Sequence, residues 1–127
     1  MCLDRLTAFV IEEDGVFYKW VSKHKDRYFG TSFMVEGCST GYVVGVQYNA
    51  DILEIGSPRY ESGFHGFTSI KDAELARERM GKLKYANVLV KCQYKGVLAT
   101  GEEYLNLVGW DRVSVIVVKQ IVILGEV

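Results

Sequence analysis

A short segment of this 127-residue sequence combines residue types that can bind a small charged ligand. From Gly63 to Ser69 the chain carries two glycines, two phenylalanines and a histidine, directly before a region of helical periodicity. Glycine allows the backbone to approach a ligand closely, and aromatic rings offer stacking faces. Thr68 and Ser69 fall where a helix start exposes unpaired N–H groups, which can hold phosphate or carboxylate. Arg59, just before the segment, can supply a forked donor to an anion.

The same segment also has a purely structural interpretation. In it, Phe64 and Phe67 belong to the core, and His65 is a buried histidine with its hydrogen bonds satisfied. Asp72, three residues after Ser69, occupies the helix start and repels an anion there. The sequence leaves both interpretations open.

Residues of the same kinds stand elsewhere in the chain. A pocket that encloses a nucleotide-like ligand needs stacking faces and phosphate donors. Further candidates are Tyr42 for stacking and Lys91 for phosphate. The predicted ligand-binding set is Arg59, Tyr60, Phe64, His65, Phe67, Thr68, Ser69, Trp110 and Arg112. The alternative for all five rings, Tyr42, Tyr60, Phe64, Phe67 and Trp110, is that they are ordinary strand residues.

The cysteines and histidines predict no metal site. They are Cys2, Cys38, Cys92, His24 and His65. The cysteines lack CxxC spacing and the histidines stand far apart, so we expect neither a metal nor another cofactor. If Met1 is removed, Cys2 gains the adjacent thiol and amine of N-terminal nucleophile hydrolases, but Leu3 stands where amidotransferases have glycine. We therefore interpret Cys2 as structural or incidental.

Composition and periodicity predict the elements that position these residues. One proline, 13 glycines, 8 tyrosines and 6 phenylalanines suit short twisted strands joined by tight turns. Strand-like runs cover 6–11, 16–21, 28–35, 41–48, 85–94 and 113–124, with a charged connector at 23–27, a loop at 49–58 and a polar link at 95–103. Asp14-Gly15 predicts a hairpin turn between the first two runs.

One helix is predicted at about residues 70–82. Ser69 and Asp72 have the spacing of a capping box, in which the acid reaches back to the cap residue. Gly81 lies near the end, as a C-terminal stop requires. The apolar face consists of Ile70, Ala73, Ala76, Met80 and Leu83.

The predicted fold is α+β, with a twisted, mainly antiparallel sheet of about five to seven strands and one principal helix. We expect a single domain over residues 1–127, since this length suits one core. The run 113–124 does not alternate strictly, so both of its faces should be covered. The helix can cover one face, and we expect a second copy of the chain, in a homodimer, to cover the other. The alternative is a hairpin of residues 6–21 folded over that face.

Charge and hydropathy exclude several classes of function. Fifteen Lys and Arg against 16 Asp and Glu give a net charge of −1, which speaks against general nucleic-acid binding. No run of about 18 apolar residues occurs, so no membrane span is expected. The first residues lack the layout of a signal peptide. We expect a cytoplasmic protein.

Short motifs spread over about 110 residues resemble those of small phage and prophage proteins of unknown role. These motifs are Tyr18-Lys19, Gly63-Phe64-His65, Asp72-Ala73, Val88-Leu89-Val90-Lys91-Cys92 and Asp111-Arg112-Val113. The resemblance implies a compact α+β domain encoded by a mobile element and located in the host cytoplasm. In size, strand content and expected oligomer the chain is also similar to phage anti-defence proteins that sequester nucleotide signals. That similarity implies a non-enzymatic protein that binds a cyclic nucleotide or an ADP-ribose derivative.

Two other functions remain open. ADP-ribosyltransferase-like folds also place an aromatic–Thr/Ser turn before a helix and a Glu near a late strand. His24 or His65, a tyrosine, and Glu102 or Glu103 are the candidates for such a triad, but their order and spacing fit poorly. We interpret Glu102-Glu103 as a solvated turn. The third function is inhibition of a host protein through the aromatic surface.

Overall fold

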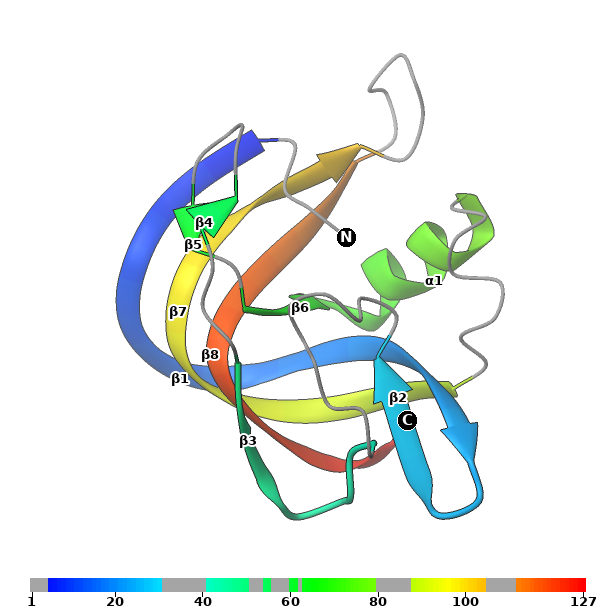
Figure 1. Ribbon diagram of the computed structural model, residues 1–127. Coiled ribbons are helices and arrows are strands. Elements are labelled where there is room, and N and C mark those ends of the chain that lie inside the picture. Colours follow the sequence, from blue (N-terminus) through cyan, green and yellow to red (C-terminus); the bar gives the residue numbers. More distant parts are fainter. Residues whose placement is uncertain are drawn as a thin grey trace.

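Three long, curved strands form the framework of the molecule. The structure is a computed structural model that describes residues 5–30, 41–50, 54–55, 60–61, 63–79, 88–104 and 112–127. β1 spans Arg5–His24, β7 spans Val88–Tyr104 and β8 spans Arg112–Glu126. β7 lies between the other two and pairs antiparallel with both along most of its length. In Figure 1 the three strands bend together as one wall.

Shorter strands complete the sheet. The six-stranded sheet also contains β2 (Arg27–Gly30), β3 (Gln47–Asn49) and β6 (Phe64–Phe67), while β4 (Glu54–Ile55) and β5 (Tyr60–Glu61) form a separate pair. β6 pairs with β8 and, through Phe67 and Tyr18, with β1. Since β7 also joins β1 to β8, these four strands pair in a closed circuit.

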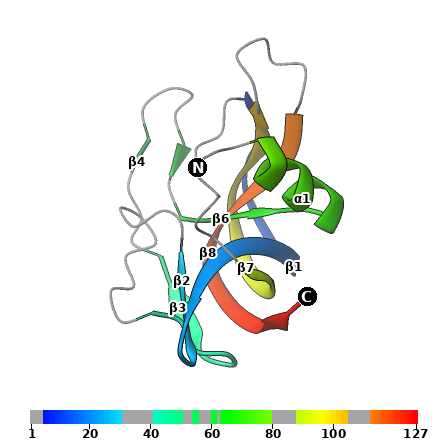
Figure 2. The ribbon, with the colours of Figure 1, turned by 90° about the vertical axis from the view of Figure 1, so that its right-hand side faces the viewer.

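One helix, α1 (Ile70–Arg79), occurs in the described ranges. Figure 2 shows α1 and the β4–β5 pair on opposite sides of the molecule. The predicted α+β fold, a mainly antiparallel twisted sheet with one helix, is therefore confirmed. Residues 80–82 of the predicted helix lie outside the described residues. No helix in the described part of the chain is long and apolar enough to cross a membrane.

The hairpin turn predicted at Asp14-Gly15 is wrong. β1 continues through both residues and stays paired with β7, where Asp14 lies opposite Lys95 and Gly15 opposite Tyr94. The register shifts between Ile11 and Asp14, so the Asp-Gly signal marks a bulge in a continuous strand. A Cβ at Gly15 would lie 2.6 Å from the Tyr94 hydroxyl oxygen, so any larger residue there requires the Tyr94 side chain to shift.

The first hairpin lies instead at the predicted connector 23–27. β1 and β2 pair as far as His24 and Arg27, and Lys25 in the turn has a φ of 58°. The predicted link 95–103 is also wrong, because these residues continue β7 and remain paired with β8. Local polarity thus located the connector at 23–27 but gave the wrong element at 95–103, since partners on neighbouring strands decide where a strand ends.

Other predicted strands differ in extent. The run 41–48 becomes a strand only from Gln47, and Tyr42 before it makes an isolated bridge to Tyr28. Within the predicted loop 49–58, residues 54 and 55 form β4. Residues 31–40 and 85–87 lie outside the described residues.

Six apolar residues of β8 are buried within one chain, whereas Leu124 is 48% exposed. Val113, Val115 and Val117 pack in a cluster with Ala73 and Ala76 of α1. A second cluster takes Val118, Ile121 and Ile123 together with side chains of β1, β2, β6 and β7. All six β8 side chains are at most 1% exposed. These six side chains therefore expose no apolar surface that a second subunit or the hairpin 6–21 would have to cover. The homodimer remains a prediction, but the burial of these residues no longer supports it.

The helix begins at the predicted cap. The Ser69 Oγ accepts a hydrogen bond from the Asp72 N–H at 3.1 Å, as an N-cap residue does. The Asp72 carboxylate, which the capping box would direct back to Ser69, accepts instead from the Ser114 N–H of β8 at 3.2 Å. The acid at this position ties the helix to the sheet.

Candidate functional site

The predicted ligand-binding segment is built into the core. Phe64, His65 and Phe67 of β6 are each at most 1% exposed. The Phe64 ring meets the Tyr42 ring edge-on, with 6.1 Å between their centroids, and Tyr42 is itself 1% exposed. These aromatic rings therefore pack against other parts of the protein, as in the structural interpretation that the sequence left open.

The two glycines of the segment also face the protein. A Cβ at Gly66 would overlap the Phe17 ring, and a Cβ at Gly63 would overlap the Val118 carbonyl oxygen. Close backbone approach is thus required here, as the glycines suggested. The groups approached are a core ring and a neighbouring strand.

A buried lysine holds β6 against β1. Lys19 is 3% exposed, and its Nζ donates a hydrogen bond to the His65 carbonyl oxygen at 2.5 Å. The His65 Nδ1 lies 3.1 Å from the Gly63 carbonyl oxygen. A buried ammonium is tolerated only with hydrogen-bond acceptors around it. Lys19 therefore ties the two strands beside their backbone pairing at Tyr18 and Phe67.

The helix start and Arg112 lie at one end of β8. Thr68 is exposed, and its N–H donates to the Ser114 carbonyl oxygen at 3.3 Å. Arg112, two residues earlier on β8, is exposed and forms an ion pair of 3.8 Å with Glu102. The structure therefore places the predicted Thr68, the cap residue and Arg112 in one region. The Asp72 carboxylate lies there too, which disfavours an anion.

The structure describes only some of the other predicted ligand-binding residues. Arg59 and Trp110 lie outside the described residues, and of Tyr60 only the backbone, in β5, is described. Lys91 is exposed on β7, opposite Tyr18 of β1, and Tyr18 pairs on its other side with Phe67 of the segment.

The candidate triad residues that the structure describes are dispersed. His24 lies at the turn between β1 and β2, His65 is buried in β6, and Glu102 lies on β7 opposite Ser114. His24 is six residues along β1 from Tyr18, where β6 joins, a span of about 20 Å in a strand. Among the described residues, no group of three or more His, Cys, Asp or Glu side chains could hold a metal ion.

A groove that the sequence did not predict lies between α1 and the ends of three strands. Its lining is Trp20 of β1, Glu74 and Arg77 of α1, Val88 and Leu89 of β7, Glu126 of β8, and Val127. We call it the Trp20 groove. Its volume is about 340 Å³, within the range of small-molecule sites.

A cation–π contact between an arginine and a tryptophan characterises this groove. The Arg77 guanidinium lies over the Trp20 ring, with 4.6 Å between its Cζ and the ring centroid. The indole is held in place because its Nε1 donates to the Ala73 carbonyl oxygen at 2.6 Å. A guanidinium plane that covers one aromatic face can stack a second flat ring on its other side.

Two carboxylates flank the pair of Arg77 and Trp20. Glu74 lies one helical turn before Arg77 on α1 and is exposed. Glu126 forms an ion pair of 3.3 Å with Lys23, and both side chains are about two-fifths exposed. The groove therefore offers hydrogen-bond acceptors beside a stacking surface. The cationic side chains of Arg77 and Lys23 partly neutralise the negative charge of the two carboxylates.

No local sequence pattern predicts this groove. Glu74 and Arg77 belong to the polar face of the predicted helix, and Trp20 to a predicted strand. They meet only because α1 packs over the end of β1. The one local feature that could have indicated a site was Trp20 in an aromatic strand. From sequence alone, a tryptophan that lines a groove cannot be distinguished from one in the core.

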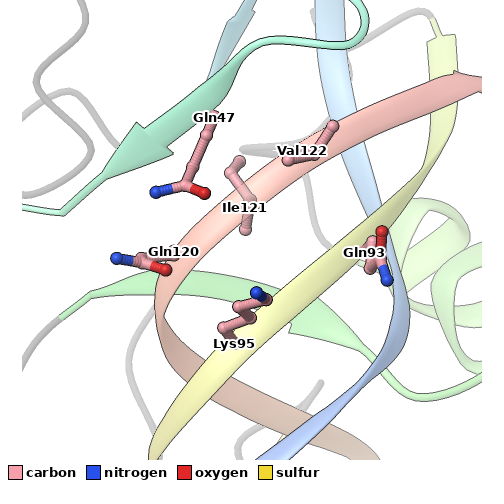
Figure 3. A pocket seen from close by; sticks show the side chains of 6 residues that line it. All are labelled: Gln47, Gln93, Lys95, Gln120, Ile121 and Val122. Atoms are coloured by element: carbon pink, nitrogen blue, oxygen red, sulfur yellow. The ribbon is translucent and has the colours of Figure 1, made fainter.

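A second hollow lies on the sheet surface and is much smaller, at about 20 Å³. Figure 3 shows Gln47 of β3, Gln93 and Lys95 of β7, and Gln120 of β8 around it, together with Ile121 and Val122 of β8. That volume accommodates a single small group.

Comparison with known proteins defines no family for the chain. No protein-family model matches it, and no curated protein or solved structure matches it either. The class of protein is therefore given by its architecture, an α+β domain with a closed circuit of strands and one helix. Its function has to be argued from its sites.

Proposed function

We propose that this protein binds a small nucleoside-type ligand in the Trp20 groove and does not transform it. The observation that carries the proposal is the combination of a ligand-sized volume of about 340 Å³ with a cation–π contact of 4.6 Å between Arg77 and Trp20. Most of the lining comes from regular secondary structure, which holds a site more rigidly than loops do.

The groove matches the parts of a nucleoside. A base stacks on the outer face of the Arg77 guanidinium, which the fixed Trp20 ring supports from behind. Ribose hydroxyls and exocyclic amino groups donate hydrogen bonds to the carboxylates of Glu74 and Glu126. A phosphate on the same ligand has Lys23 within reach, next to Glu126.

Holding a ligand is the task to which these side chains are suited. Arg77 is engaged with Trp20, and Glu126 with Lys23, so each group is already oriented by a neighbour. Preorganised groups lose little entropy when a ligand arrives, which raises affinity. The finer part of the proposal is sequestration of a cyclic nucleotide or an ADP-ribose-derived immune signal by a phage-type protein, and it rests on the sequence resemblance alone.

Calorimetric titration with adenosine, AMP, cyclic dinucleotides and cyclic ADP-ribose isomers tests the site. We expect heat with at least one of them and about tenfold weaker binding in Arg77→Ala, the loss of roughly one stacking contact. Arg112→Ala is the matched control, since it removes an exposed arginine outside the groove. Silence of the whole panel contradicts the proposed function. Weakening by Arg112→Ala alone moves the ligand to the helix start.

A second experiment separates binding from turnover. The protein is incubated with NAD or with the ligand found above, denatured by heat, and the released small molecules are separated by chromatography. A binding protein returns its ligand intact. Recovery of a product that Glu102→Gln abolishes would instead establish the ADP-ribosyltransferase-like alternative.

A further inference from the structure

Figure 3 shows four polar side chains of the sheet surface around one hollow, on β8 and on its two neighbours β3 and β7. Gln47 of β3 and Gln93 of β7 both lie opposite Val122 of β8, one on each side of it. Gln120 lies two residues before Val122 on β8, and Lys95 is its partner on β7. Successive residues alternate between the faces of a strand, so Gln93 and Lys95, like Gln120 and Val122, share one face.

The donors and acceptors of these four side chains are available to a ligand. Within the described ranges, Gln47, Gln93, Lys95 and Gln120 have no side-chain hydrogen bond or ion pair with the protein. In Figure 3 the Lys95 ammonium points toward the space between Gln120 and Gln93. Each amide can present an NH₂ group with two donors, and the ammonium presents three.

We propose that this hollow is an anion site for a single phosphate or carboxylate group, separate from the Trp20 groove. Ammonium and amide N–H groups are the donors that such oxygens accept, and charge-assisted hydrogen bonds are the stronger ones. The volume of about 20 Å³ is little more than one water needs, so a phosphate or carboxylate places one or two oxygens there. The occupant is therefore the charged end of a ligand whose remainder lies over the open sheet.

Charges around the hollow set how strongly it binds. Lys95 lies between Gln120 on β8 and Asp14 on β1, and Asp14 is exposed. A carboxylate about 5–6 Å away in water opposes an anion by a factor of roughly three. Asp14→Asn should therefore bind the anion more tightly. A variant that merely lost structure would bind it more weakly, so this result could not come from unfolding.

The experiment uses inorganic phosphate and, in a second arm, acetate, each added at constant ionic strength. Amide proton and side-chain NH₂ resonances are followed by ¹H–¹⁵N NMR. The expected result is saturable shifts at the NH₂ groups of Gln47, Gln93 and Gln120. The two arms decide between phosphate and carboxylate as the preferred group.

Variants of one strand supply the controls. Lys95→Gln should weaken binding about five- to tenfold and Asp14→Asn should tighten it about threefold. Lys91→Gln removes an exposed lysine on the same face of β7, four residues away and outside the hollow, and should change affinity less than twofold. Equal weakening by the two lysine variants, or the absence of saturable shifts at the glutamines in both arms, overturns the proposal. The Trp20 groove plays no part in this readout, so the two proposals fail independently.

Discussion

Gly66 packs directly against the Phe17 ring, where β6 crosses next to β1. A methyl group at this position has to displace a ring that is fully buried. Gly66→Ala should therefore lower the free energy of unfolding by about 2–3 kcal/mol, the upper range for overpacking in a core. Urea denaturation followed by circular dichroism measures this.

A double variant identifies the cause. If the clash with Phe17 is responsible, Gly66→Ala combined with Phe17→Leu should be less destabilising than the sum of the single changes by at least about 0.5 kcal/mol. Strict additivity would show that the contact between Gly66 and Phe17 does not govern this position.

At the scale of elements, α1 depends on a cap and on a tie to the sheet. Ser69→Ala removes the acceptor for the Asp72 N–H and should lower the free energy of unfolding by about 1 kcal/mol. Thr68→Ala is the control, because Thr68 is exposed and contributes its backbone N–H, which alanine retains. That variant should stay within about 0.5 kcal/mol of the wild type. Equal losses in both variants would mean that Ser69 does not act as the cap.

For the whole molecule, β8 is the strand on which both core clusters depend. Val117 is 0% exposed and packs in the cluster that α1 covers. Val117→Glu buries a carboxylate without a partner and should cost more than about 4 kcal/mol, much of the stability of a typical domain. We expect this variant to lose its cooperative unfolding transition. Lys119→Glu changes an exposed position of the same strand and should stay folded.

The homodimer is tested separately by light scattering of the wild type. A mass of twice the 14.3 kDa of one chain at micromolar concentration would support it, and a mass of 14.3 kDa contradicts it. If Val117→Glu remained folded and only changed the mass, then Val117 would lie at an interface, and the burial described above would not hold in solution.

The sequence determined those features that depend on nearby residues. The periodicity of residues 70–82 and the spacing of Ser69 placed the helix start, because capping is a local hydrogen bond. The apolar density of 113–124 predicted the strand β8 but not how it is covered. Exposed Ser114, Lys119 and Leu124 lie between buried residues, so along most of β8 one face is covered and the other is open.

Tertiary structure decided everything that depends on partners. Asp14-Gly15 is a bulge because β7 continues alongside it, and the polar run 95–103 is strand because β8 pairs with it. The candidate sites divide in the same way. The burial of Phe64 and His65 follows from β6 lying between β1 and β8, and Trp20 meets Arg77 only where α1 crosses the end of β1. Such meetings join residues tens of positions apart, and no spacing along the chain encodes them.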